Sequence, residues 1–458
     1  MIKVSNPFGS QYSPLELPDN AFVASMRAPE PISDPEAAIN EALRSPVGSE
    51  PLSDIARRRI QMNPDSTAVI VISDNTRPVP YKGRSGILMP VVDVLMREGY
   101  KPSSITVLIA TGMHRPMTDS EIRNMLDERI FSLGIKVLNH QPKNPERLRF
   151  MGTTARGTKA MIDTVYADAD LKILTGLVES HFMAGASGGR KSICPGVIGE
   201  ESTYVFHGPE LMDAEKSSDL IIDGNPVHEE SLAVAHLAGA DFIVNVTLDH
   251  SFRITGVFAG DLEMAHLKAV SRLRESVAVP VPYEADIVIT HGGFVGINHY
   301  QCAKCAVASL GALKKGGYLI SIADLTDSGH KIGSVNYRVT SALLRLLGSD
   351  GFSHLIKSPD WTFLLEQWQV QQWAKVFRKT AQDRFYFYAP QAEESWFDVI
   401  PGVNAGKLLA PDTSTADSMS DAIKASLEDI CRRCGRRIED MRIIYLSDGP
   451  YGIPFCAV

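Results

Sequence analysis

A glycine-rich segment around one lysine is the part of the sequence whose residue types and spacing most suggest a binding or catalytic site. It reads SHFMAGASGGRKSICPG and spans residues 180–196. Phosphate-binding loops follow the pattern G-x-x-x-x-G-K-[ST], in which backbone N–H groups surround phosphate and the lysine reaches the terminal phosphates. Gly185 and Lys191 stand at the required positions, but Arg190 replaces the second glycine. One hypothesis is therefore a nucleotide-triphosphate-dependent enzyme that uses residues 185–192 as a phosphate loop.

Two features argue against this hypothesis. The bulky side chain of Arg190 stands where the backbone itself would have to approach phosphate. A phosphate loop also connects a strand directly to a helix, whereas the polar segment ESHFMAGA (179–186) separates this loop from the preceding apolar run. We therefore favour an interpretation in which Lys191 serves a different chemistry.

The elements that must position such residues can be predicted from apolar runs rich in β-branched residues. The predicted strands are 67–74, 104–112, 170–176, 240–249, 285–293, 316–324 and 441–449. Amphipathic segments such as 87–99 and 305–313 lie between them and are predicted to be helices. This alternation predicts an α/β fold with mainly parallel sheets and helices on both faces. Ligands bind beyond the carboxyl ends of the strands in such sheets, so polar residues at those ends are candidates for function.

Candidate residues follow the first two predicted strands. Asp74 and Arg77 lie in SDNTRP, and His114 lies in ATGMHRPMT. An arginine can hold a carboxylate or phosphate through two parallel hydrogen bonds, and an aspartate can orient a neighbouring group. The alternatives are an Asx turn with a solvated arginine, and a surface histidine. A helix is expected to begin after this histidine, near Asp119 or Ser120.

Two further histidines flank the lysine. His181 follows the predicted strand 170–176 and precedes Lys191, and His207 lies in TYVFHGPE. Neutral imidazole is a common acid, base and metal ligand near neutral pH. The alternative for His207 is an ordinary imidazole at a helix C-terminus, because the following Gly-Pro is a helix stop signal.

The second half of the chain contributes THGGFVGINHYQCAKC, residues 290–305. His291 ends a predicted strand, and Tyr300, Gln301 and Lys304 follow. Gln301 and Lys304 are three residues apart, so on a helix they share a face and could bind one anion. The alternative is a solvated helix face.

Length and composition limit the possible classes of protein. A chain of 458 residues with 44% hydrophobic and 22% charged residues is expected to be globular with two or three domains. The proline-rich stretch 278–285 is the expected boundary between domains 1–280 and 281–458. A net charge of -8, with Lys and Arg scattered along the chain, makes nucleic acid an unlikely partner. No signal peptide or long apolar segment is evident, so we expect a cytoplasmic protein that does not associate with membranes.

The six cysteines are too sparse for a disulfide framework. Cys302/Cys305 and Cys431/Cys434 form two C-x-x-C pairs, which could together bind zinc. A separation of roughly 125 residues is much longer than in zinc ribbons, so incidental cysteines are the favoured interpretation.

The segments SDNTRP, ATGMHRPMT, SHFMAGASGGRKSICPG, FHGP and YQCAK together resemble the nickel-dependent lactate racemase family, whose members use a nickel-pincer nucleotide. The resemblance runs in order from about residue 70 to residue 305, and the spacing of His181, Lys191 and His207 fits it. It implies that Lys191 covalently carries a pyridinium-3-thioamide-5-thiocarboxylic acid mononucleotide. It further implies that His207 is the protein ligand of the nickel. The other residues that it implies near the cofactor are Asp74, Thr76, Gly188 and Gly189, with the two glycines bringing the backbone close to the cofactor.

The resemblance also implies roles around the substrate. His114 and His181 would be the acid/base pair, and Arg77 would bind the substrate carboxylate. Further substrate contacts would come from the second domain, through Tyr300, Gln301, Lys304 and a tryptophan. Trp368 is the nearest match, with Trp361 and Trp373 as alternatives.

The implied activity is inversion of C2 in a 2-hydroxy acid by hydride transfer to and from the cofactor. The acid could be lactate-like, a dicarboxylate or a sugar acid. The first domain would bind the cofactor, the second would close over the substrate, and the active site would lie in the cleft between them. Enzymes that make the cofactor are the expected partners. A non-catalytic binding protein with the same fold is a less favoured alternative.

Overall fold

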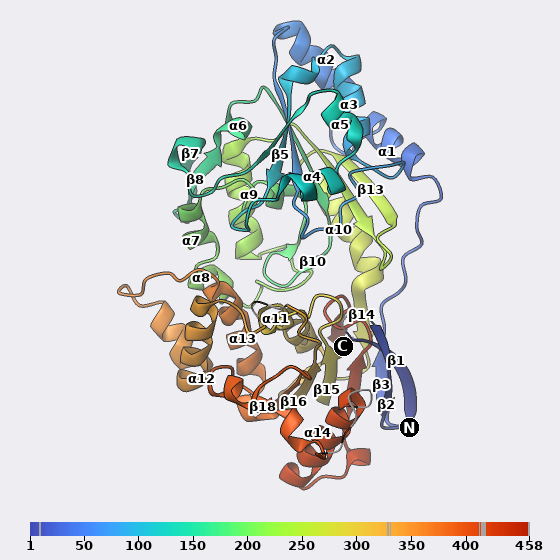
Figure 1. Ribbon diagram of the computed structural model, residues 1–458, viewed down its shortest axis with the longest axis vertical. Coiled ribbons are helices and arrows are strands. Elements are labelled where there is room, and N and C mark those ends of the chain that lie inside the picture. Colours follow the sequence, from blue (N-terminus) through green and yellow to red (C-terminus); the bar gives the residue numbers. More distant parts are fainter. Residues whose placement is uncertain (9–10, 328, 330, 412, 414–417, 457–458) are drawn as a thin grey trace. The chain divides into compact units, whose positions relative to one another are not determined.

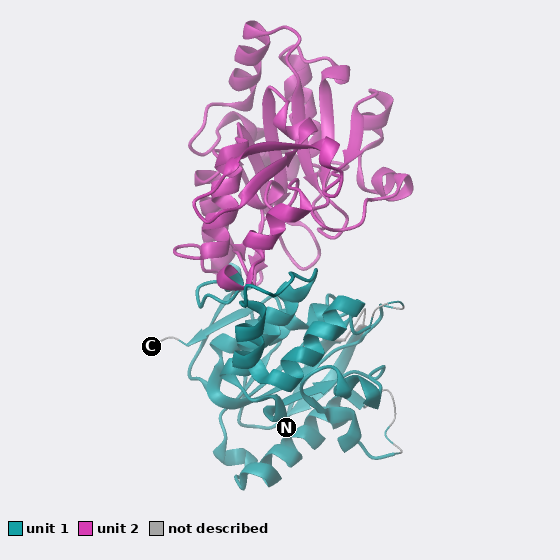
Figure 2. Cartoon of the chain, turned by 90° about the vertical axis from the view of Figure 1, so that its left-hand side faces the viewer, with its two compact units in different colours: residues 1–27, 212–219, 276–458 teal, residues 28–211, 220–275 magenta. Residues whose placement is uncertain are grey.

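The computed structural model describes residues 1–458 except 9–10, 328, 330, 412, 414–417 and 457–458. The chain forms two compact units: unit 1 comprises residues 1–27, 212–219 and 276–458, and unit 2 comprises 28–211 and 220–275 (Figure 2). The boundary that the sequence predicted at 278–285 lies beside the change of unit at Ser276. The N-terminal residues and the short segment 212–219, however, belong to unit 1 and not to the domain 1–280 that the sequence predicted.

Unit 2 is built on a six-stranded sheet with the order β13-β12-β9-β4-β5-β6, of which Figure 1 labels β5 and β13. Its strands are β4 (Ala68–Ser73), β5 (Ile105–Ala110), β6 (Lys136–Asn139), β9 (Leu171–Leu177), β12 (Phe242–Leu248) and β13 (Ile254–Gly260). All neighbours run parallel except β12 and β13, which are antiparallel. The sheet is therefore mainly parallel with one antiparallel edge.

Both faces of the central strands in unit 2 are buried. Ile70 and Ile72 of β4 join a core with apolar residues of α1 (Pro35–Arg44), α2 (Leu52–Met62) and α3 (Leu88–Arg97). Val69 and Val71 point to the opposite face and are also buried. Full burial of such side chains contributes about 1.5–3 kcal/mol each, which explains the continuous apolar runs in the sequence.

Unit 1 contains a second six-stranded sheet, all parallel, with the order β18-β17-β16-β15-β19-β3. Its strands are β3 (Ala21–Ala24), β15 (Ala285–His291), β16 (Leu313–Ile322), β17 (Phe385–Tyr388), β18 (Val403–Asn404) and β19 (Ile443–Leu446). The N-terminal strand β3 pairs with β19 near the C-terminus. This pairing explains why the first residues of the chain belong to unit 1.

Helices cover both faces of the unit 1 sheet. Apolar residues of α14 (Ser418–Cys434) pack with Tyr386 and Tyr388 of β17. The alternate residues Phe385 and Phe387 face α13 (Gln367–Lys379) and α11 (His299–Ala308), where their rings contact Trp373 and His299. The α/β fold with mainly parallel sheets and helices on both faces is confirmed.

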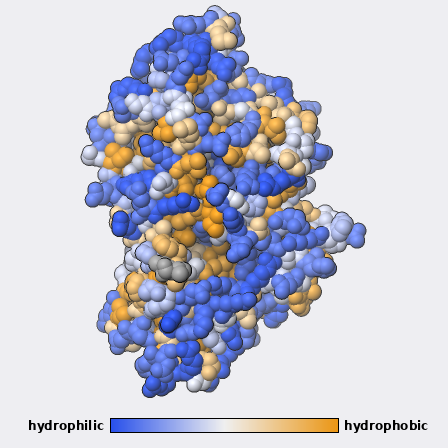
Figure 3. All heavy atoms as spheres, turned by 180° about the vertical axis from the view of Figure 1, so that it is seen from behind, coloured by the Kyte–Doolittle hydropathy of each residue, from blue (hydrophilic) through white to orange (hydrophobic). Residues whose placement is uncertain are grey.

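The helix predicted at 305–313 begins earlier, at His299, because the side chain of Asn298 caps it by accepting the N–H of Gln301. The surface drawn in Figure 3 is mostly hydrophilic, as expected when the apolar strands are covered by helices. Within the described residues, no helix has both the length and the apolar character needed to cross a membrane.

Candidate active site

Three of the predicted site residues follow adjacent strands of unit 2. Asp74 comes directly after β4, His114 follows β5, and His181 follows β9. The sheet order places these strands side by side as β9-β4-β5, and all three run parallel. Their carboxyl ends therefore meet at one edge of the sheet, which is the place where α/β sheets bind ligands.

Asp74 and His114 form a hydrogen-bonded pair at this edge. Nδ1 of His114 lies 2.7 Å from Oδ2 of Asp74. The other carboxylate oxygen of Asp74 accepts from the Thr76 hydroxyl at 2.6 Å and from the Thr76 N–H at 3.2 Å. Burial opposes ionisation of Asp74, but the hydrogen bonds from His114 and Thr76 outweigh it and lower the pKa of this carboxyl group. Asp74 is thus a buried carboxylate, whereas His114 is 59% exposed.

This geometry determines how His114 can act. A ring nitrogen that faces a carboxylate carries the hydrogen, so Nδ1 of His114 donates to Asp74. Nε2 then presents its lone pair and can accept a proton. The carboxylate would stabilise the imidazolium that forms, as in other aspartate–histidine pairs.

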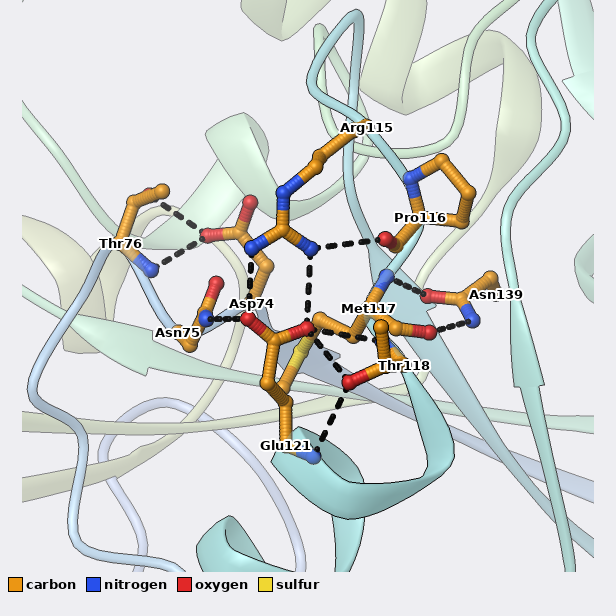
Figure 4. A network of polar contacts seen from close by, with 9 residues as sticks. All are labelled: Asp74, Asn75, Thr76, Arg115, Pro116, Met117, Thr118, Glu121 and Asn139. Carbon is orange, nitrogen blue, oxygen red and sulfur yellow. Dashed lines mark hydrogen bonds and ion pairs between the residues drawn. The ribbon is translucent and has the colours of Figure 1, made fainter. Parts of the chain in front are cut away.

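A network of hydrogen bonds and ion pairs connects the two loops that carry Asp74 and His114 (Figure 4). Its centre is Glu121 on α4 (Asp119–Met125), whose carboxylate accepts from Asn75 at 3.1 Å and from Arg115 at 2.9 Å. Thr118 caps the same helix and forms a capping box with Glu121, so the helix begins where the sequence predicted. Asn75 adjoins Asp74 and Arg115 adjoins His114 in the chain, so the network limits how far the two loops can separate.

The glycine-rich segment folds against the same sheet. Gly188 and Gly189 have φ values of +74° and +52°, and a Cβ on either would meet protein atoms closer than 3 Å. The obstructing atoms belong to Val178 and Asn245 for Gly188, and to the His266 ring for Gly189. The need for glycine therefore arises from the backbone conformation and from protein packing. Contact of these glycines with a cofactor stays a prediction.

The buried side chain of Arg190 forms hydrogen bonds with the backbone of this segment. Its guanidinium is only 1% exposed and donates to the carbonyl of Ala184 at 2.7 Å and, more weakly, to that of Gly188 at 3.4 Å. Hydrogen bonds that involve a charged group contribute about 1.5–3 kcal/mol each. Only a 3-10 turn, Gly189–Ser192, begins at the loop. A phosphate loop needs the N-terminus of a helix at this point, so the geometry disfavours that hypothesis.

Lys191 lies near aromatic rings and near the charges of Arg190, Arg77 and Glu179. Its Nζ is 5.8 Å from the centre of the Phe206 ring, and that ring is 4.3 Å from the ring of His207. Burial, together with the positive charges of Arg190 and Arg77, lowers the pKa of the Lys191 ammonium to about 7. Burial and the charge of Lys191 lower the pKa of His207 to about 3. The imidazole is therefore neutral at pH 7, and a large fraction of the lysine is an uncharged amine.

The reactivity of Lys191 should reflect this lowered pKa. In protein produced without cofactor-making enzymes, acetylation of Lys191 by a small active ester is expected to reach half its maximal rate near pH 7, because only the neutral amine reacts. An ordinary lysine has a pKa of about 10.4 and would still be gaining reactivity at pH 9. Mass spectrometry of the Lys191 peptide, with the exposed Lys159 as internal reference, measures the profile. A rate that keeps rising up to pH 10 would contradict this environment.

His181 is held in a short hairpin formed by β10 (Ser180–His181) and β11 (Gly185–Ala186). Its Nδ1 accepts the backbone N–H groups of Met183 and Ala184, each at 3.3 Å. With Nδ1 as acceptor, the neutral ring carries its hydrogen on Nε2. The structure therefore orients the two histidines differently, with a lone pair on Nε2 of His114 and a hydrogen on Nε2 of His181.

The other predicted site residues lie in unit 1. Tyr300 is on α11, and its hydroxyl accepts from Nε1 of Trp368 at 2.9 Å. Gln301 follows it, and its Oε1 is buried with no hydrogen-bond partner among the described residues. Lys304 lies one helical turn further along α11. A buried amide oxygen without a partner is costly, so it calls for an explanation such as a ligand group that donates to it.

The three candidate tryptophans have different surroundings. Trp368 contacts Tyr300, as described above, whereas Trp361 donates to Gln367 at 2.9 Å. Trp373 is 1% exposed and stacks on His299 within the core. Trp368 is therefore the tryptophan that adjoins a predicted substrate residue.

The cysteine pairs do not meet in the structure. Cys302 and Cys305 are buried in α11, and Cys431 and Cys434 lie on α14. Across the part of the chain that is described, no group of three or more His, Cys, Asp or Glu side chains could hold a metal ion. The four-cysteine zinc site is therefore not formed there.

Sequence reasoning missed two residues of this region. Glu179 pairs with Arg77, with 2.7 Å between Oε1 and Nη1. Asn245 on β12 is fully buried, and its Oδ1 accepts the N–H of Gly189 at 2.8 Å. Glu179 is a polar residue that follows the end of β9, and polar residues after strand ends were the criterion that identified Asp74. Asn245 could have been noticed as a polar residue inside an otherwise apolar strand.

Comparisons with known proteins identify the family. Residues 8–219 match a family described as the lactate racemase N-terminal domain. The chain is 33% identical over 336 residues to a lactate racemase of Thermoanaerobacterium thermosaccharolyticum, a match that covers 72% of this chain and 76% of that protein. It is 31% identical over 357 residues to a lactate racemase of Lactiplantibacillus plantarum, covering 74% and 77%.

Solved structures agree with these matches. The lactate racemase apoprotein from T. thermosaccharolyticum superposes with a TM-score of 0.83 at 27% identity, over 99% of this chain and 100% of that chain. A protein from Thermotoga maritima has a TM-score of 0.61 at 17% identity over 93% and 99% of the two chains, which shows a likeness of fold alone. The chain belongs to the lactate racemase family, as its motifs indicated. It is an enzyme of the isomerase class, a racemase.

Proposed function

We propose that this racemase inverts C2 of a 2-hydroxy acid, lactate or a larger acid, with a nickel-pincer nucleotide attached to Lys191. The observation that carries the proposal is that Lys191 and His207 both adjoin the Phe206 ring, with Nζ of the lysine 5.8 Å and the imidazole 4.3 Å from its centre. Burial lowers the pKa of both groups, which favours their uncharged forms. The hydrogen-bonded Asp74 and His114 lie in the same unit. Together they supply an attachment point, a metal ligand and a base.

The residues present fit this cofactor. A neutral amine can form a covalent link to an acyl-type carbon, whereas an ammonium cannot. A neutral imidazole suits Ni(II), and one protein ligand suffices because the pincer itself would supply two sulfurs and a carbon. The proposed centre therefore does not require a cluster of metal-binding side chains. When bound, the cofactor supplies an electrophilic carbon that takes the C2 hydrogen as hydride and returns it.

The protein's own residues manage the proton and the substrate. Nε2 of His114 would take the hydroxyl proton, and the carboxylate of Asp74 would stabilise the resulting imidazolium. His181 would be the second acid/base group and serve the opposite enantiomer, with its ring orientation set by the backbone of Met183 and Ala184. Arg77 would hold the substrate carboxylate while the C2 centre becomes planar.

Residues of unit 1 complete the proposal. The buried Oε1 of Gln301 is an acceptor without a partner in the described chain, and a substrate hydroxyl could supply one. Lys304 would add a positive charge for an anionic substrate. The expected position of the active site between the two domains, the cytoplasmic location and the association with cofactor-making enzymes stay predictions.

Loss of optical purity tests the proposed function. Protein produced together with cofactor-making enzymes and loaded with nickel would be incubated with single enantiomers of lactate, glycerate, malate and gluconate. We expect chiral chromatography to show inversion at C2 of at least one acid, which for the first three approaches an equal mixture of enantiomers. Retained optical purity of all four acids, with cofactor and nickel bound, would contradict the proposal. Absence of nickel in this protein would favour a non-catalytic binding protein.

A further inference from the structure

An ion pair adjoins the residues assigned to the substrate. Oε1 of Glu179 lies 2.7 Å from Nη1 of Arg77, and the two side chains are 34% and 31% exposed. The carboxylate of Glu179 and the guanidinium of Arg77 are both partly exposed to solvent, so a small ligand can reach both. The mechanism proposed above uses Arg77 and assigns no task to Glu179.

The backbone of Glu179 is fixed by the segment that carries Lys191. The N–H of Glu179 donates to the hydroxyl of Ser187 at 2.9 Å, and the N–H of Ser187 donates to the carbonyl of Glu179 at 2.9 Å. Glu179 is also two residues before His181. Electrostatic interactions connect the charges of Glu179 and Arg77 with the ammonium of Lys191. Glu179 therefore belongs to the immediate surroundings of the proposed cofactor attachment point and of one proposed acid/base residue.

The ion pair with Glu179 leaves hydrogen-bond donors of Arg77 available for a ligand. A guanidinium has five N–H donors, and one carboxylate takes at most two of them. Arg77 can therefore hold a substrate carboxylate while it remains paired with Glu179. The rest of the substrate then lies close to a fixed negative charge that accepts hydrogen bonds but cannot donate them.

We propose that Glu179 is a specificity-determining residue that selects substrates by the group on C3. A second carboxylate in the substrate would be repelled by the like charge of Glu179. A hydroxyl group would donate a hydrogen bond to it, and an apolar methyl group would gain nothing. The inference rests on the proposed function, and it names the favoured substrates as monocarboxylic 2-hydroxy acids that carry further hydroxyl groups.

Three acids that differ only at C3 provide the test. Lactate carries a methyl group there, glycerate a hydroxymethyl group and malate a second carboxylate. For the loaded wild-type enzyme, kcat/KM is expected to be highest for glycerate and lowest for malate. Glu179→Gln keeps the shape and removes the charge. It is expected to raise the malate-to-lactate ratio of kcat/KM about tenfold, mainly through a lower KM for malate, and to lower the glycerate-to-lactate ratio.

The matched control is Glu201→Gln, the same chemical change at an exposed position in a 3-10 turn (Glu200–Ser202) of unit 2. It is expected to leave both ratios unchanged. A malate-to-lactate ratio that stays within twofold of the wild type in Glu179→Gln would overturn the inference, as would a wild-type preference for malate. Those outcomes leave the proposed function intact, whereas bound cofactor and nickel with no racemisation of any of the three acids would count against both.

Discussion

Racemase activity is expected to fall below detection when Lys191 is replaced by alanine, because this variant has no amine to which the cofactor could be attached. Burial and the charges of Arg190 and Arg77 disfavour the Lys191 ammonium and lower its pKa to about 7, so loss of this group is expected to cost the fold little stability. The Lys191→Ala protein should therefore fold with a thermal midpoint close to that of the wild type. Chiral chromatography measures the loss of activity, and elemental analysis should show loss of nickel in parallel.

The matched control is Lys159→Ala, which removes an exposed lysine of the same unit. This variant is expected to keep both nickel and activity. Racemisation by Lys191→Ala at a rate near that of the wild type would show that the cofactor is held in another way, and the assignment of Lys191 would then be wrong.

Turnover is expected to fall by about 10²- to 10⁴-fold in Asp74→Asn and in His114→Ala, the usual range for loss of a positioned acid/base group. In Asp74→Asn, the amide can donate to Nδ1 of His114, which moves the ring hydrogen to Nε2 and removes the lone pair that accepts the proton. Nickel content should remain at the wild-type level in both variants, because neither residue is proposed to hold the metal. The loss should lie in kcat more than in KM.

Asp65→Asn serves as the control for the aspartate change, since Asp65 is 90% exposed and precedes β4, at the end of this strand opposite to Asp74. It is expected to leave kcat unchanged. If Asp74→Asn kept the wild-type kcat with lactate or with the best substrate of the panel, His114 could not depend on this carboxylate for its orientation. The proposed base would then have to be sought elsewhere.

Much of unit 2 could be predicted from the sequence because its strands are local features. Strands buried along most of their length, such as β4 and β9, require nearly continuous apolar residues, and the chain shows them. Because parallel strands share one carboxyl edge, the polar residues that follow those strands had to gather there. This reasoning alone placed Asp74, His114 and His181 at one edge of one sheet.

The division of the chain into units could not be predicted in the same way. Strand β3 pairs with β19, more than four hundred residues later, and nothing in the local sequence of either strand indicates this partner. The short strands β17 and β18 are likewise defined by their neighbours in the sheet. Apolar periodicity reports burial, not the identity of the covering element.

Which side chains contact each other within the site could also not be predicted from the sequence. Arg77 was expected to bind a ligand carboxylate, but its pairing with Glu179 depends on the fold that brings two loops together. Gly188 and Gly189 were expected to admit a cofactor, yet Asn245 and His266 occupy the space that a Cβ would need. Both findings arise from contacts between residues far apart in the chain.

Peptide mapping by mass spectrometry tests most directly whether Lys191 carries the cofactor of this racemase. The protein would be produced together with cofactor-making enzymes, loaded with nickel, shown to racemise a 2-hydroxy acid and then digested. We expect the added mass of the pyridinium mononucleotide on the peptide that contains Lys191, and on no other lysine. An unmodified Lys191 in nickel-containing, active enzyme would contradict the proposed function at its centre.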